Sequence, residues 1–127
     1  MKRAVTETTI LTDSQVRTLA KQLRGFLAQS FPGIDSSGHD PETSIRMMAL
    51  SAKCKEAREK RALSIKDVAA QLRVPQYRIK AIEKPSMREL KPDYLKAFVE
   101  FLGLKRWVRR WVAANAELAE RLGIHDI

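Results

Sequence analysis

The stretch that decides the fold is SIKDVAAQLRVPQYRIKAIE, residues 64–83. Its large apolar residues recur three or four positions apart within each half: Val68 and Leu72, then Ile79 and Ile82. This spacing predicts two short helices, each with one apolar face. Val74 would fill the turn between them, and the small Ala69 would lie where they touch, because a larger side chain there would push them apart. Residues 64–83 therefore predict two short helices that cross closely at a steep angle.

The segment before this stretch predicts a longer helix. Asp40 followed by Pro41 has the order of an N-cap and a first-turn proline, and helix-forming residues continue to about Ala62. The residues expected to face inward are Ile45, Met48 and Ala52. Ser64, with Asp67 three residues further on, then gives the start signal for the first short helix.

A helix is also expected near the amino terminus. Thr12 and Gln15 form a capping box, and Leu11 and Val16 are spaced as a hydrophobic staple. The helix should run to about Ser30. Its expected buried face is Val16, Leu19, Leu23, Phe26 and Leu27.

The carboxyl-terminal part predicts two more helices. Pro92 can open one and Gly103 can close it, and a last helix runs from about Leu104 to Leu122. The apolar line of the last helix is Leu104, Val108, Trp111, Leu118 and Leu122, interrupted by Asn115. From Val108 on, this spacing suits a coiled-coil seam in which Asn115 would fix the register of a dimer, or an intramolecular core. In the second case this helix and the first one would both fold back onto the motif, and the two arrangements can hold at once.

The positive charge is concentrated in the middle of the chain. The formal net charge is +9, and residues 46–110 hold 18 Lys and Arg against 7 Asp and Glu, a net +11. The remaining residues hold 6 basic and 8 acidic side chains, a net −2. Clustered positive charge favours a phosphate ligand, although a solvated basic surface is the plainer interpretation.

Several function classes find no support in the sequence. No apolar run reaches the roughly 18 residues that a bilayer span needs, and no signal-peptide pattern stands at the start, so we expect a cytoplasmic protein. Cys54, His39 and His125 lack zinc-ligand spacing, and they do not form a catalytic set with a serine or aspartate. We expect neither enzyme activity, nor a metal, nor a cofactor.

Residues 47–104 resemble the XRE family, the helix-turn-helix proteins that include phage repressors and many antitoxins. The matching residues are Arg58, Leu63, Ser64, Val68, Ala69, Leu72, Val74, Ile79, Ile82, Glu83, Pro92, Leu95, Phe98 and Leu102 to Leu104. The resemblance implies an all-α, repressor-like helix-turn-helix bundle of about five helices with additional N-terminal and C-terminal helices. It also implies that Arg58 and Glu83 form a structural pair.

Three positions depart from the family pattern. Arg73 stands where the family prefers glycine, so a left-handed backbone would cost about 1 kcal/mol, or the turn is wider. Pro75 replaces the usual capping serine or threonine, and Ile65 replaces a frequent glutamine that reaches DNA in relatives. These departures bear on base readout more than on the fold.

The resemblance implies a recognition helix at about residues 75–84 in the major groove of double-stranded DNA. The candidate base-contacting residues are Gln76, Tyr77, Arg78 and Lys80. Glutamine suits adenine and arginine suits guanine, because each matches the hydrogen-bonding pattern of that base. The candidate phosphate contacts are Lys60, Arg61, Lys66, Lys84 and Arg88.

These observations predict three parts: an amino-terminal arm, helix and loop (1–40), a DNA-binding domain (41–104), and a last helix that can dimerise (105–127). The expected function is a sequence-specific transcriptional regulator acting as a homodimer. The alternative is an antitoxin, or another interaction module, that keeps the helix-turn-helix as a scaffold and grips a toxin-like partner protein with its terminal helices.

Overall fold

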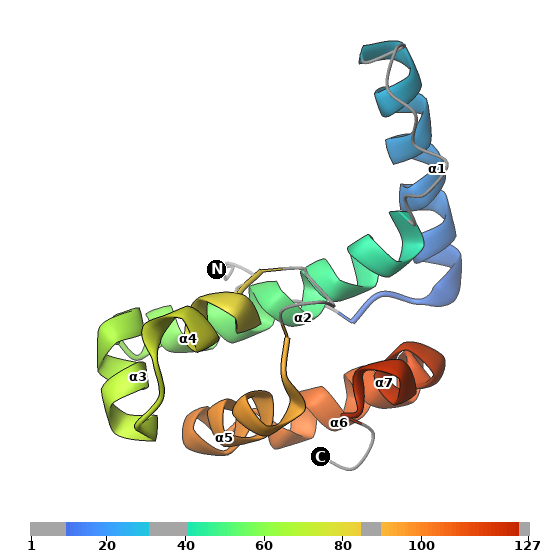
Figure 1. Cartoon of the computed structure of the whole chain (residues 1–127). Coiled ribbons are helices and arrows are strands. Elements are labelled where there is room, and N and C mark those ends of the chain that lie inside the picture. Colours follow the sequence, from blue (N-terminus) through green and yellow to red (C-terminus); the bar gives the residue numbers. More distant parts are fainter. Residues whose placement is uncertain (1–9, 31–40, 85–89, 125–127) are drawn as a thin grey trace, which may run out of the picture.

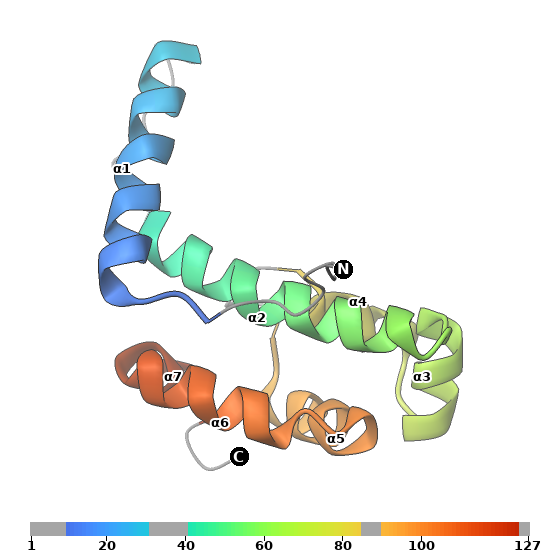
Figure 2. The same ribbon diagram turned by 180° about the vertical axis from the view of Figure 1, so that it is seen from behind.

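The computed structural model describes residues 10–30, 41–84 and 90–124, and within these ranges it contains helices and no strand. The helices are α1 (Asp13–Ser30), α2 (Pro41–Lys60), α3 (Ile65–Leu72), α4 (Gln76–Ile82), α5 (Pro92–Leu102), α6 (Lys105–Ala114) and α7 (Ala116–Leu122). The prediction of an all-α helix-turn-helix bundle is confirmed. Figures 1 and 2 show α3 and α4 at the carboxyl end of α2, α1 standing off its amino end, and α5 to α7 on one side.

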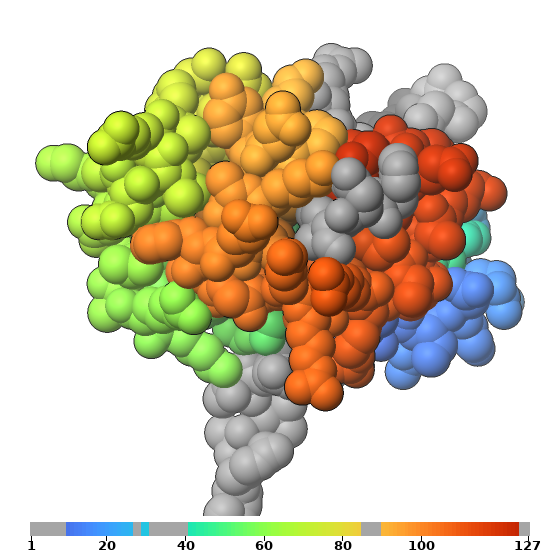
Figure 3. All heavy atoms as spheres, turned by 90° about the horizontal axis from the view of Figure 1, so that it is seen from below, coloured from blue at the N-terminus to red at the C-terminus, as the bar shows by residue number. Residues whose placement is uncertain are grey.

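One continuous core joins α2 to α7. Its most deeply buried large residues include Trp111, Phe98, Met47, Leu50 and Ile79. Because the core takes residues from every helix after α1, the short helices α3 and α4 are held by a scaffold much larger than themselves. Figure 3 shows α5, α6 and α7 packed along one face, with α3 and α4 at one edge and α1 at the other.

Helix α1 begins at the predicted capping box. The Thr12 backbone N–H donates to Gln15 Oε1 (2.9 Å), and the Gln15 N–H donates to Thr12 Oγ1 (3.2 Å). Val16 and Ala20 are buried in a small second cluster with Ile45 of α2. The first turns of α1 are therefore anchored to the body.

The predicted buried face of α1 is wrong beyond its first turns. Leu19 is 40% exposed and Phe26 is 57% exposed, and Leu23 is half-buried. The side chain of Leu27 lies outside the described residues. The reason is visible in Figures 1 and 2: α1 crosses α2 near its own start and then leads away from the body, so its later turns lie apart from the other described helices.

Helix α2 has the predicted span to within two residues, and Ile45 is buried as expected, but the other two residues expected to face inward were assigned wrongly. Met48 is 54% exposed and Ala52 is also exposed, whereas Met47, Leu50 and Cys54 are buried. Because α2 packs against α1 at its start and against the main core further along, more than one face is covered. The sequence pattern therefore predicts that a helix forms here, but it does not predict which side of the helix faces the core.

The predicted single helix over residues 104–122 is wrong. It is broken at Asn115 (φ −131°, ψ 45°), which ends α6 and precedes α7. Arg46 Nη1 donates to Asn115 Oδ1 (2.6 Å), and Asn115 Nδ2 donates to the Trp111 carbonyl (2.9 Å). A polar contact from α2 therefore holds the bend.

The apolar line of this segment is buried inside the chain. Val108 and Trp111 are fully buried, and Leu118 and Leu122 are at least nine-tenths buried. The interpretation as a coiled-coil seam is therefore wrong, and the alternative of an intramolecular core holds. Asn115 bonds within its own chain and fixes no register between two chains.

Candidate nucleic-acid interface

Helix α3 is fixed at its start by a complete capping box. The Asp67 N–H donates to Ser64 Oγ (3.0 Å), and the Ser64 N–H donates to Asp67 Oδ2 (2.9 Å). The backbone N–H of Ser64 holds the pKa of the Asp67 carboxyl below its ordinary value, and the Ser64 side chain adds to this effect. The signal read from the sequence is confirmed.

The turn between α3 and α4 is tight. Arg73 has the left-handed conformation (φ 58°, ψ 47°), so the wider turn weighed from the sequence is not formed. Pro75 is the N-cap residue of α4, and its side chain makes no capping hydrogen bond. The Val74 N–H donates to the Ala69 carbonyl (3.0 Å), which closes the end of α3.

Small and branched side chains pack where α3 and α4 meet. Val68 and Ile79 are fully buried, and Ala69 is 4% exposed. The small Ala69 lets the two helices approach, as the spacing predicted. Burying these side chains fixes which face of α4 is left to solvent.

Arg58 of α2 ties the end of α4 to the scaffold. Its Nε and Nη2 donate to the two carboxylate oxygens of Glu83 at 2.7 and 2.9 Å, and its Nη1 donates to the Leu63 carbonyl at 2.8 Å. Hydrogen bonding to Glu83 raises the pKa of Arg58 above its ordinary value. The two side chains are only 10% and 7% exposed, so this pair holds α4 and is removed from any ligand.

The four candidate base-contacting residues all lie on α4, but they do not point the same way. Gln76, Tyr77 and Lys80 are exposed, with Tyr77 at 60%, whereas Arg78 is half-buried. Its guanidinium lies against the rings of Tyr77 and Tyr94, with Cζ 4.9 Å from each ring centroid. Sequence reasoning missed Tyr94, because no local pattern brings the first turn of α5 onto α4.

The candidate phosphate contacts have different environments. Lys60, Lys66 and Lys84 are exposed around α3 and α4, whereas Arg88 lies outside the described residues. Arg61 donates to the Phe101 and Leu102 carbonyls at 3.3 and 2.8 Å, so its guanidinium caps the end of α5. Lys80 and Lys84 lie on and directly after α4, while Asp67 of α3 and Glu83 at the end of α4 are engaged in a cap and an ion pair.

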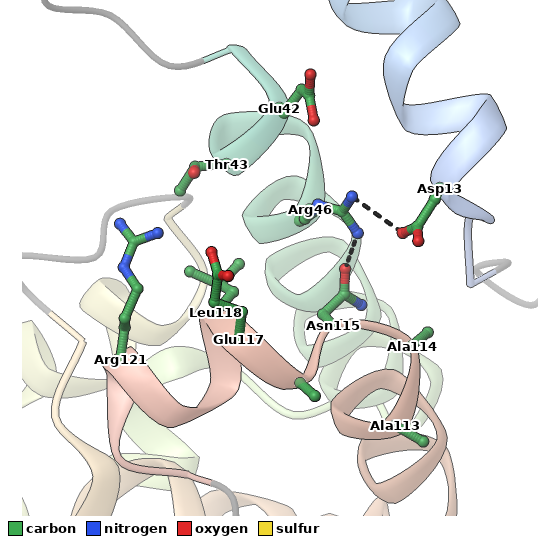
Figure 4. A pocket seen from close by; sticks show the side chains of 11 residues that line it. Asp13, Glu42, Thr43, Arg46, Ala113, Ala114, Asn115, Glu117, Leu118 and Arg121 are labelled. Carbon is green, nitrogen blue, oxygen red and sulfur yellow. Dashed lines mark hydrogen bonds and ion pairs between the residues drawn. The ribbon is translucent and has the colours of Figure 1, made fainter.

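A pocket lies at the other end of α2, away from α4. This pocket of about 570 Å³ opens between α1, α2, α6 and α7, and side chains of both charges line it (Figure 4). Arg46 lies within it, bonded to Asp13 (3.0 Å) and Asn115. Trp111 Nε1 donates to the Arg46 carbonyl (3.2 Å). These bonds connect α1, α2 and α6, which gives Arg46 a structural role.

The described residues were also compared with what a reactive thiol, a metal site or a membrane span requires. Burial raises the pKa of the Cys54 thiol, and the Glu83 carboxylate raises it further, so the thiol stays protonated. No group of three or more His, Cys, Asp or Glu in the described part of the chain could hold a metal ion. No described helix is both long enough and apolar enough to cross a bilayer.

Comparison with known proteins bears on the segment that contains α3 and α4. Residues 53–106 match the family model of a helix-turn-helix domain. Neither a curated protein nor a solved structure matches the chain. The matched residues run from the second half of α2 to the start of α6, so the α3–α4 pair and its close crossing at Ala69 lie within the stretch that is similar to a helix-turn-helix domain.

Proposed function

We propose that this protein is a sequence-specific DNA-binding transcriptional regulator of the XRE type, with α4 in the major groove. The observation that carries the proposal is the division of α4 into two sides. Ile79, Ala81 and Ile82 are buried on the scaffold, whereas Gln76, Tyr77 and Lys80 are exposed. An exposed polar helix face fits the major groove, which is wide enough to admit a helix.

Two further observations support this assignment. The Arg58–Glu83 bond is the pair that the XRE resemblance implies, and the cations around α4 suit a phosphate backbone. We place the DNA-binding unit at residues 41–104, with 1–40 and 105–127 as its flanking parts. The role is binding rather than catalysis, and a DNA ligand would place the protein in the cytoplasm.

The test is selection of duplexes from a random pool, followed by titration at several salt concentrations. Affinity should fall with salt, with a log-log slope of about 0.9 per phosphate contacted. Arg78→Ala should weaken binding by about 1 to 3 kcal/mol, and Lys66→Ala should weaken all sequences alike. Lys21→Ala is the matched control, because Lys21 is an exposed lysine on α1, at the other end of α2. If Arg78→Ala and Lys66→Ala bind as tightly as the unaltered protein, α4 is not the reading helix.

We propose that α1 supplies the contact of a homodimer. Regulators of this kind read two half-sites as a two-fold dimer, and the apolar line of α6 and α7 is already used inside the chain. Helix α1 instead leaves Leu19 and Phe26 40% and 57% exposed, and burying this apolar area against a second copy would be favourable.

Sedimentation of the whole protein tests this contact. Phe26→Glu should give the mass of one chain, whereas Thr18→Glu, which adds the same charge at an exposed position on another side of α1, should leave the dimer intact. An unchanged mass for Phe26→Glu would exclude α1 as the dimer contact.

The exposed apolar residues of α1 also favour the second candidate, an antitoxin or interaction module with a toxin-like protein partner. In that case the unaltered chain sediments as a monomer and co-purifies with a small protein, and Phe26→Glu releases that protein. The two functions overlap where such a protein also binds DNA through α4.

A further inference from the structure

Arg78 differs from the structural arginine of the same domain in how its donors are used. Arg58 has acceptors for Nε, Nη1 and Nη2. The Nε of Arg78 is buried, and no residue in the described part of the chain accepts a hydrogen bond from it. A buried donor on a charged group is costly to leave unsatisfied, so Arg78 is in a state that an added acceptor would stabilise.

Two aromatic rings fix where the Arg78 guanidinium lies. Its Cζ is 4.9 Å from the centroid of the Tyr77 ring and 4.9 Å from that of the Tyr94 ring. Tyr77 is on α4 and is 60% exposed, whereas Tyr94 is in the first turn of α5 and packs against the main core. A cation over aromatic faces is held by the charge distribution of the rings, and few of its rotamers remain. Tyr94, held by the core, is the fixed side of this arrangement.

We propose that Tyr94 is a positioning residue that, together with Tyr77, presets Arg78 to donate to an acceptor on DNA. The inference rests on the proposed function and adds a residue outside the recognition helix. The acceptor is a guanine edge or a phosphate oxygen, since each takes hydrogen bonds from a planar guanidinium. Presetting raises affinity because the side chain loses less conformational freedom when it binds.

The test compares complete proteins that carry Tyr94→Leu, Tyr94→Phe, Arg78→Ala, or Tyr94→Leu with Arg78→Ala. Each is titrated with the duplex that the unaltered protein selects, and with duplexes changed at one base pair at a time. Tyr94→Leu should weaken binding about threefold to tenfold, the effect of freeing one long side chain. Tyr94→Phe keeps the ring and should bind as the unaltered protein does.

The double variant separates positioning from a purely structural role. If Tyr94 acts through Arg78, Tyr94→Leu weakens binding no further once Arg78 is alanine. An equal loss in both backgrounds, or full affinity of Tyr94→Leu, would overturn the inference while the proposed function stands. If the unaltered protein selects no duplex, the proposed function fails and the inference falls with it.

The Arg78→Ala variant identifies the acceptor. Loss of preference at one G·C pair indicates a guanine edge, whereas a salt slope smaller by about 0.9 with unchanged preference indicates a phosphate. Both outcomes support the inference.

A second measurement needs no change at Tyr94 and so does not depend on the folding of that variant. The Nε–H resonance of Arg78, assigned by its absence in Arg78→Lys, should shift when the selected duplex is added. A resonance that stays in place on saturation with the duplex would overturn the inference.

Discussion

The α3–α4 pair and the α6–α7 pair are both short helices joined by a sharp change of direction, yet they are held in different ways. The turn after α3 has local causes: the capping box at Ser64, the left-handed Arg73 and the preset backbone of Pro75. The bend before α7 depends on Arg46, which is 69 residues from Asn115 along the chain. A turn with local causes can be recognised in a sequence, and a bend held from a distance cannot.

The two pairs also differ in what they leave exposed. α4 buries one side and leaves Gln76, Tyr77 and Lys80 in solvent. The α6–α7 pair uses its apolar line for the main core, with Trp111 fully buried. The first pair therefore presents a surface, and the second supports it. Changes at the bonds of each pair test this division.

The largest effect is expected from Glu83→Ala, which removes the partner that holds the end of α4. Arg58 would remain almost buried without a compensating carboxylate, so the free energy of unfolding should fall by about 3 to 5 kcal/mol in urea denaturation. Glu59→Ala is the matched control: its carboxylate lies 4.0 Å from the same arginine but is 57% exposed, and its loss should cost less than about 1 kcal/mol. Equal costs for the two variants would mean that the Arg58–Glu83 pair does not anchor α4.

The next effect tests the bend of the second pair. Asn115→Leu removes the acceptor of Arg46 Nη1, and the free energy of unfolding should fall by about 1 to 3 kcal/mol. Ala114→Gln, at an exposed neighbouring position, should change it by less than about 0.5 kcal/mol. If Asn115→Leu is as stable as the unaltered protein, the bend at residue 115 adds nothing to the free energy of unfolding compared with a straight helix over residues 104–122.

The contrast between the pairs explains which predictions succeeded. The caps at Thr12, Ser64 and Pro92, and the glycine stop at Gly103, were readable because each hydrogen bond or backbone angle involves neighbouring residues. The exposure of the later turns of α1, and the side of α2 that is buried, were not predicted. Both depend on which other helices pack against α1 and α2. At the candidate site, α4 was placed from the sequence, but the Arg78–Tyr94 contact joins two helices and leaves no periodic trace.

A smaller effect, of opposite sign, is expected at the turn of the first pair. Arg73→Gly removes a side chain from a left-handed backbone, and the free energy of unfolding should rise by about 1 kcal/mol. Ala62→Gly should act in the same direction, because Ala62 also has a positive φ of 55°. Asn115→Gly should not, since φ at the bend is −131°. A loss of stability in Arg73→Gly would mean that the arginine side chain contributes more than the strain costs.

The smallest effect is a change in pH dependence at the start of α3. The folded state holds the pKa of Asp67 below its ordinary value of 3.8, mainly through the backbone N–H of Ser64. A carboxyl with a lowered pKa stabilises the fold above its ordinary value, and this contribution is lost as the pH falls through 3.8 toward the folded value. Asp67→Asn should therefore lose stability at neutral pH and approach the unaltered protein below that range, as urea denaturation at each pH would measure.

Ser64→Ala separates the titration of Asp67 from the loss of the cap itself. The variant loses the hydroxyl that accepts from the Asp67 N–H, but it keeps the backbone N–H that is the first cause of the lowered pKa. Its stability at neutral pH should fall by about 1 kcal/mol for a lost N-cap, and its pH profile should flatten less than that of Asp67→Asn, because the Ser64 side chain is only the second cause of the lowered pKa. If Ser64→Ala flattens the pH profile as much as Asp67→Asn does, the hydroxyl and not the backbone N–H sets the charge of Asp67. In that case the side chains of the box, rather than the backbone of the preceding turn, hold the start of α3.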